Sequence, residues 1–263
     1  FAAGSSRDGV TKGLANMTNQ LLKEGAGKLT ADAFSEQFSA TGARMSVGLG
    51  RDMAWASLRT LSNSERTAES LALFIDAVTK PRFDDIAVRR LKARTLVGLQ
   101  HKKQSPGIIA TEALFRGLYG AHPYGSPIEG KETTVSATTR ADISAFHSQY
   151  YVARNAVVAI VGAVSRAQAE AVSDALSEQL AAGEKAKPLS EVISPAPSEE
   201  YIDFPSIQSH VRVGVPGMRR GDPDYFPLLV GNHVLGGSSL VSILFREIRS
   251  KRGLSYSAYS YFM

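Results

Sequence analysis

Apolar residues recur at helical spacing in residues 13–24, and this segment organises the interpretation of the whole chain. The apolar positions are Leu14, Met17, Leu21 and Leu22. They share one face, which predicts an amphipathic helix with that face buried. Gly25 follows, where a helix usually ends. Three amides, Asn16, Asn19 and Gln20, stand at positions i, i+3 and i+4 of the same helix, so we expect them close together near one face.

The same periodicities predict further elements along the chain. Helices are expected over residues 30–42, 64–80, 84–104, 106–118, 138–150 and 165–180. Alternating or continuous apolar runs predict strands over residues 44–49, 52–61 and 155–161. Later in the chain we expect a strand at 208–215, helices at 223–235 and 238–251, and a strand at 254–262. This mixture indicates an α+β protein.

Residues 183–200 are polar and proline-rich and have no periodicity. They predict a linker between an N-terminal domain, residues 1–182, and the start of a C-terminal domain, residues 201–263. After the linker, the predicted elements are a strand, two helices and a strand. This order is similar to the order at the beginning of the first domain.

Composition changes this picture little. The formal net charge is +5, and many of the cations cluster in residues 82–103. Such a cluster is typical of a solvated helix face or of a surface that meets an acidic partner, and no nucleic-acid-binding module is present.

No apolar run approaches the roughly 20 residues that span a bilayer. Cysteine is absent, which excludes disulfides and thiolate metal sites. Cytoplasm and bacterial periplasm both remain open, with the periplasm slightly favoured.

The three amides stand where zinc chemistry would need other groups. Two histidines and a glutamate spaced H-x-x-E-H on a helix hold zinc and activate its bound water. Here Asn16, Asn19 and Gln20 occupy those positions. A carboxamide is a poor zinc ligand and no useful base near neutral pH. The histidines of the chain show no spacing typical of a ligand pair, and no G-x-S-x-G nucleophile motif is present.

Four sequence segments resemble the pitrilysin/insulinase family of metallopeptidases, which includes the mitochondrial processing peptidases. They are residues 3–8 (AGSSRD), 13–15 (GLA), 119–125 (YGAHPYG) and 244–256 (LFREIRSKRGLSY). The resemblance covers essentially the whole chain and points to an inactive, bacterial-type member. It implies two homologous α+β domains, each with an antiparallel sheet covered by helices on one side. The second domain would be truncated in this sequence, and the first strands would be missing.

The resemblance also implies a third zinc ligand, a glutamate roughly 75–80 residues after the second histidine, near residues 97–99. No Asp or Glu occurs between Ile86 and Thr111, so we expect no metal site on this chain. Arg249 and Tyr256 match the arginine–tyrosine motif of the family. An arginine near a helix end and a tyrosine in a strand also have ordinary structural explanations. In the family, this pair faces the peptide cleft and hydrogen-bonds the substrate carbonyl.

These expectations predict a non-catalytic subunit of a heterodimeric zinc peptidase. It would form part of a chamber for unfolded peptides, with zinc in a homologous partner and Arg249 and Tyr256 acting in trans. Two alternatives remain: a structural core-like subunit of a larger complex, and a peptide-binding homodimer without proteolysis. A self-sufficient peptidase with another metal site is the least favoured alternative, and zinc content would test it.

Overall fold

The computed structural model describes residues 1–62, 64–238 and 240–263, and the chain divides into two compact units. Unit 1 spans Phe1–Val213 and unit 2 spans Gly214–Met263. The helices of unit 1 are α1 Leu14–Leu21, α2 Ala31–Ala40, α3 Ser64–Thr79, α4 Asp85–Lys102, α5 Pro106–Tyr119, α6 Glu132–Ala137, α7 Arg140–Tyr150 and α8 Arg166–Ser177. Short 3₁₀ turns are η1 Ser5–Arg7, η2 Pro123–Gly125 and η3 Ala153–Asn155. The helices predicted from periodicity in unit 1 are all confirmed.

The sheet of unit 1 is a hairpin of β1, Arg44–Leu49, and β2, Ala54–Arg59. The strands are antiparallel, from the pair Arg44–Arg59 to the pair Leu49–Ala54. Gly48 lies opposite Trp55, and a Cβ atom at Gly48 would lie 2.1 Å from the Trp55 ring. Only glycine therefore lets the indole ring lie over β1 in this way. The predicted strand pair is confirmed, and the α+β class with it.

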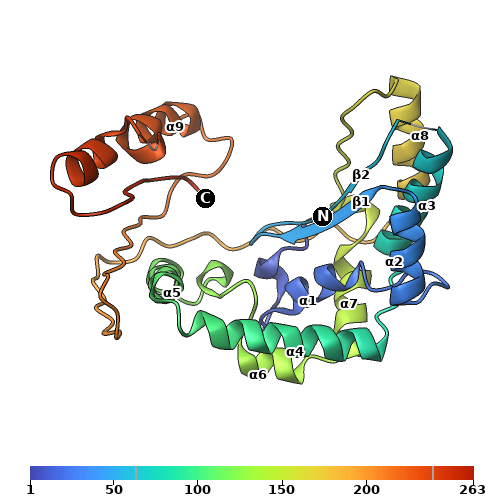
Figure 1. The fold of residues 1–263 in the computed structure, drawn as a ribbon, viewed down its shortest axis with the longest axis horizontal. Helices are drawn as coiled ribbons and strands as arrows, with labels where there is room; N and C mark the ends of the chain where they lie inside the picture. Colours follow the sequence, from blue (N-terminus) through green and yellow to red (C-terminus); the bar gives the residue numbers. More distant parts are fainter. Residues whose placement is uncertain (63, 239) are drawn as a thin grey trace. The chain divides into compact units, whose positions relative to one another are not determined.

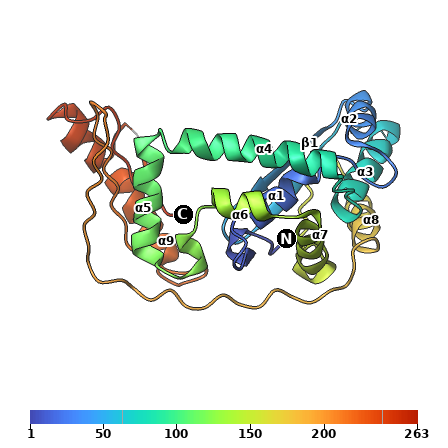
Figure 2. The same cartoon turned by 90° about the horizontal axis from the view of Figure 1, so that it is seen from below.

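The core of unit 1 forms around α1. The fully buried side chains of Met17, Leu21 and Leu22 pack with residues of α4 and α7, including Leu91 and Ile143. Helix α1 contacts α4, α7 and β1, and both views show α4 running past α1 and α6 (Figures 1 and 2). Deep burial of this short helix explains why its apolar face is the clearest pattern in the sequence.

The strand predicted over residues 155–161 is wrong. Most of this segment is extended, but it makes no ladder within the described residues. Val157 and Val161 are 90% and 98% exposed. A strand needs a neighbouring backbone along its length, and in the described chain only the Ala2 amide, which donates to the Asn155 carbonyl at 3.1 Å, reaches the backbone of this segment from another part of the backbone.

Residues 183–213 have no regular secondary structure, belong to unit 1 and are mostly exposed. Side chains elsewhere in unit 1 hydrogen-bond the backbone of this segment. Arg7 donates to the Lys187 carbonyl at 2.6 Å, and Asn155 Oδ1 accepts from the Ala186 amide at 2.7 Å. Farther along, Arg212 donates to Thr111 at 3.1 Å. These contacts explain why the compact units divide after residue 213. The domain boundary expected at residues 183–200 stays a prediction.

Unit 2 consists of α9, Tyr225–Asn232, two π-helical segments, η4 His233–Gly237 and η5 Phe245–Ser250, and an extended segment from residue 254 onward. The helix predicted over 223–235 is confirmed. The helix predicted over 238–251 is shorter, and its residue 239 lies outside the described chain. The strands predicted at 208–215 and 254–262 are wrong, because neither segment forms a ladder with another strand among the described residues. The sheet expected in the second domain is thus not observed there.

Candidate functional site

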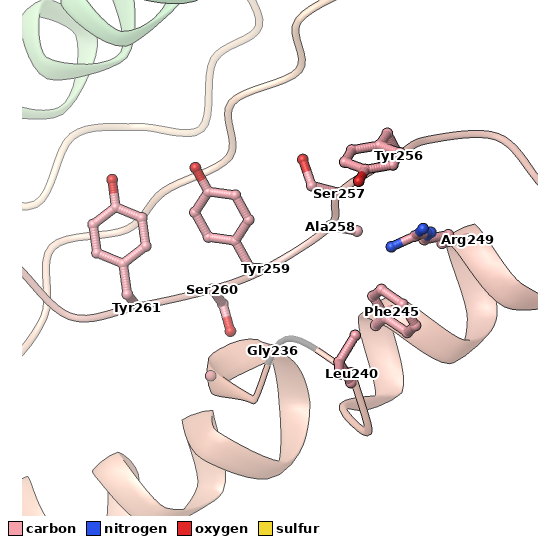
Figure 3. A pocket seen from close by; sticks show the side chains of 11 residues that line it. Gly236, Leu240, Phe245, Arg249, Tyr256, Ser257, Ala258, Tyr259, Ser260 and Tyr261 are labelled. Atoms are coloured by element: carbon pink, nitrogen blue, oxygen red, sulfur yellow. The ribbon is translucent and has the colours of Figure 1, made fainter.

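Arg249 and Tyr256 line one pocket of unit 2. Its volume is about 420 Å³. Segment η5 contributes Phe245 and Arg249, and the extended segment after residue 254 contributes Tyr256, Tyr259 and Tyr261 (Figure 3). One turn of helix separates Phe245 from Arg249, so both side chains leave η5 on the same side. The structure therefore brings the two residues of the arginine–tyrosine motif together.

The Arg249 guanidinium lies between two aromatic rings. Its Cζ atom is 4.5 Å from the centre of the Tyr256 ring and 4.9 Å from the centre of the Phe245 ring (Figure 3). A cation over an aromatic face is stabilised by the ring quadrupole, by roughly 0.5–1 kcal/mol at a partly exposed site. The two rings therefore hold the long arginine side chain in one orientation before any ligand arrives.

Two other cations of η5 and its C-terminal flank share one carboxylate. Arg246 and Lys251 both pair with Glu247, at 3.4 and 2.8 Å. The hydrogen bond from Lys251 is the main reason that the pKa of Glu247 lies below its usual value. Within the described chain, Arg249 has no hydrogen-bond acceptor or ion-pair partner for its guanidinium. Arg249 is thus oriented but not neutralised.

The extended segment after residue 254, which forms one wall of the pocket, is hydrogen-bonded to α9 and η4. The Ser260 amide donates to the Gly236 carbonyl at 3.2 Å, and Asn232 Nδ2 donates to the Ser260 carbonyl at 3.2 Å. Tyr259 and Tyr261 stack on each other with ring centres 5.8 Å apart. Two backbone contacts at Ser260 thereby position the tyrosines on either side of it. The sequence motif did not indicate the role of Asn232.

The helix with the three amides is capped by a side chain that sequence reasoning missed. Asp8 accepts hydrogen bonds from the backbone amides of Gly13 and Ala15, both at 2.7 Å. Gly13 precedes α1 with φ of 96°, a left-handed conformation that favours glycine. Burial raises the pKa of Asp8 to about 6, although both hydrogen bonds oppose that shift. The carboxyl group thus satisfies two of the free donors at the start of α1.

Asn19 is fully buried, and both the nitrogen and the oxygen of its side-chain amide are hydrogen-bonded. Its Nδ2 donates to the Gly48 carbonyl of β1 at 2.7 Å, and its Oδ1 accepts from the Tyr151 hydroxyl at 3.0 Å. Burial raises the pKa of Tyr151, so this hydroxyl stays protonated and remains a donor. The amide at the position of a general base therefore connects three parts of the fold.

The residues present do not fit a zinc ion. Asn16 and Gln20 are half-buried on α1 and carry carboxamides, and the Asn19 amide is already used in the fold. In α4, the region expected to supply a third ligand contains Val97, Gly98 and Leu99. No group of three His, Cys, Asp or Glu residues in the described ranges could hold a metal ion. The donor set therefore offers no step through zinc on this chain.

The loop YGAHPYG at residues 119–125 is structural in unit 1. His122 Nδ1 accepts from the Tyr124 amide at 3.2 Å and so caps η2. The Tyr124 hydroxyl donates to Asp52, and the Arg51 side chain donates to the Tyr124 carbonyl at 3.0 Å. The loop is thereby attached to the turn of the β hairpin.

In the described residues, no helix is long and apolar enough to cross a membrane.

Two family profiles match the chain. Residues 1–132 match "Insulinase (Peptidase family M16)", and residues 137–263 match "Peptidase M16 inactive domain". Curated relatives include an uncharacterized zinc protease of Bacillus subtilis, 24% identical over 95% of this chain and 60% of the relative. Another is an uncharacterized zinc protease of Mycobacterium leprae, 28% identical over 98% of this chain and 58% of the relative. The chain thus spans about 60% of the length of these relatives.

Solved structures share the fold of this chain. A crystal structure described as a peptidase M16 inactive domain from Pseudomonas fluorescens is 37% identical, with a TM-score of 0.95, over all of this chain and 64% of that one. A protease from Helicobacter pylori has the same fold, with a TM-score of 0.78 at 19% identity, over all of this chain and 65% of that one. With the insulinase profile covering the first half and the inactive-domain profile the second, this chain belongs to peptidase family M16.

Proposed function

We propose that this chain is part of a non-catalytic subunit of a heterodimeric zinc peptidase. A homologous partner subunit would carry the zinc, and unfolded peptide would be the substrate. This chain would contribute part of the peptide-binding chamber and would hold the substrate with Arg249 and Tyr256.

The observation that carries the proposal is an asymmetry between the two sites. At the first, Asn19 is committed to Gly48 and Tyr151, and no acid is available on α4 near the third-ligand position. At the second, Arg249 and Tyr256 are 4.5 Å apart, measured from Cζ to the ring centre, in a pocket of about 420 Å³. Carboxamides thus stand where the family motif has the groups that activate water, whereas the pair proposed to bind peptide lies together in one pocket.

The role of the pair follows from its chemistry. The guanidinium and the phenol hydroxyl are donors that can hydrogen-bond a peptide carbonyl oxygen, and they act more strongly as negative charge develops there. Holding the scissile bond in a fixed position is itself a large contribution to the rate. This chain would therefore orient the substrate in trans, while the partner supplies the zinc-activated water.

Co-expression with a zinc-bearing homologue tests the proposal. The pair of chains should cleave an unstructured, fluorogenic peptide, and Arg249→Ala or Tyr256→Phe in this chain should lower kcat/KM by about tenfold to a hundredfold. Arg246→Ala is the matched control, because Arg246 lies on the same segment, pairs with Glu247 and does not line the pocket.

If Arg249→Ala and Tyr256→Phe leave cleavage unchanged, the role in trans is wrong. A stable complex that contains no zinc-bearing chain would instead favour the structural-subunit alternative. Peptide binding by a homodimer that cleaves nothing would favour the peptide-binding alternative.

A further inference from the structure

The pocket of unit 2 contains one charged side chain and no acid. Its described lining consists of glycine, alanine, leucine, serine and aromatic residues together with Arg249. The nearest acid on the same segment, Glu247, is occupied by Arg246 and Lys251. The positive charge of Arg249 is therefore uncompensated within the described chain.

The surroundings of Arg249 restrict what can neutralise it. The Arg249 Cζ atom lies over the rings of Phe245 and Tyr256, which limits the directions from which a ligand can reach the guanidinium. The N–H groups project from the edge of the guanidinium plane, so a ligand must approach along that edge. A carboxylate matches this fork with two parallel hydrogen bonds and also cancels the charge, whereas a neutral carbonyl accepts without cancelling it.

The walls of the pocket add apolar contact area beside Arg249. Leu240 and Tyr256 are 70% and 84% exposed, so the pocket is open to water and a charge pair there is partly solvated. Tyr259 and Tyr261 are 59% and 61% exposed, and Figure 3 shows their hydroxyl ends on the same side of the extended segment. They offer ring faces to apolar parts of a bound peptide. The net charge of +5 favours the approach of an anionic peptide.

We propose that this pocket selects peptides by a carboxylate group that binds Arg249. The inference rests on the proposed function, since it names the class of peptide that the Arg249–Tyr256 pair holds. The guanidinium has five N–H donors, so it can bind a carboxylate with two of them and still donate to the scissile carbonyl. The carboxylate can come from an Asp or Glu side chain or from the C-terminus of the peptide, and the test separates these two sources.

Three labelled, N-acetylated dodecapeptides of glycine, serine, alanine and leucine serve as probes. The first has a central Glu and an amidated C-terminus, the second has Gln in place of Glu, and the third combines the Gln with a free C-terminal carboxylate. Fluorescence anisotropy with the 263-residue chain measures each Kd. At least one carboxylate peptide should bind about tenfold more tightly than the neutral one. The tighter of the two identifies the source.

Variants connect the preference to Arg249. Arg249→Gln should remove the difference between the peptides, Arg249→Lys should retain part of it because the charge is kept without the planar fork, and Arg246→Gln should leave it unchanged. Equal affinity for all three peptides would overturn the carboxylate inference and leave peptide binding standing. The inference would also be overturned if Arg249→Gln kept the preference. If none of the peptides binds, the peptide-holding role of unit 2 is wrong as well.

Discussion

Asn19 donates a hydrogen bond from Nδ2 to the Gly48 carbonyl oxygen at 2.7 Å, which connects α1 to β1 across 29 positions of sequence. The other end of the same amide accepts from Tyr151, directly after α7. A residue that cannot act as a base thus performs a structural task that a carboxylate could not perform, because a carboxylate has no proton to donate to Gly48.

Replacement of Asn19 by alanine should be strongly destabilising. The substitution leaves the Gly48 carbonyl and the Tyr151 hydroxyl without their partner in a dry interior, and a buried unsatisfied polar group costs about 1–3 kcal/mol. We expect the free energy of unfolding to fall by about 2–4 kcal/mol, measured by chemical denaturation.

Asn16→Ala is the control for that measurement. Asn16 lies on the same helix, is only half-buried and makes no side-chain hydrogen bond within the described chain. Its loss should change the free energy of unfolding by less than about 0.5 kcal/mol. Equal effects of the two substitutions would contradict the structural role of Asn19.

Restoring the motif on α1 should not restore a zinc site. In the combined variant Asn16→His, Asn19→Glu and Gln20→His, the new carboxylate would be buried against the Gly48 carbonyl with no donor from that group. Such burial raises its pKa and destabilises the fold. The missing acid on α4 leaves the ligand set incomplete. Elemental analysis after dialysis should find substoichiometric zinc, and one tightly held zinc per chain would refute this expectation.

Gly48→Ala should displace the Trp55 ring. The added Cβ would meet the indole at 2.1 Å, and Trp55 is 46% exposed, so the ring can move outward into water. We expect a loss of about 1–3 kcal/mol in stability and a red shift of the emission of Trp55, the one tryptophan of the chain.

The matched control is Gly50→Ala, at the turn of the same hairpin. The nearest atom to its added Cβ, the Met53 carbonyl oxygen, is 3.8 Å away. This variant should retain the emission of the unmodified chain. A red shift as large as that of Gly48→Ala would show that the emission reports the turn and not the contact of the ring with Gly48.

Asp8 should make stability depend on pH in the direction opposite to an ordinary surface carboxylate. Burial raises its pKa from 3.8 to about 6. Its contribution to stability is therefore complete below pH 3.8 and is lost as the pH rises through 6. Relative to Asp8→Asn, the unmodified chain should lose about 2–3 kcal/mol of unfolding free energy between pH 4 and pH 7.

Carboxyl-carbon NMR provides an internal reference for that experiment. Hydrogen bonds from the Thr139 hydroxyl and amide hold the pKa of Asp142 below its usual value. Asp142 should thus titrate below 3.8 and Asp8 near 6 in the same spectra. If Asp8 titrated near 3.8, burial would not outweigh the hydrogen bonds from Gly13 and Ala15, and the predicted loss of stability between pH 4 and pH 7 would be wrong.

Local periodicity was sufficient for the helices and for the hairpin. The apolar faces of α1 and α4 are formed by residues three or four positions apart in sequence, so a local pattern is enough to predict them. The turn at Gly50 joins two strands that are adjacent in sequence. The segments 155–161 and 254–262 carry equally apolar patterns and yet form no ladder in the described chain. A strand depends on a partner whose position local pattern does not specify.

The sequence alone determined that Asn16, Asn19 and Gln20 carry carboxamides, which are poor zinc ligands in any fold. It also indicated the arginine–tyrosine motif. Tertiary structure alone decided that Asn19 hydrogen-bonds Gly48 and also Tyr151, 132 positions away from Asn19. It also decided that Arg249 lies between two aromatic rings, with no acidic partner in the described chain. Contacts of this kind form between residues that have no fixed spacing along the chain, so no local pattern encodes them.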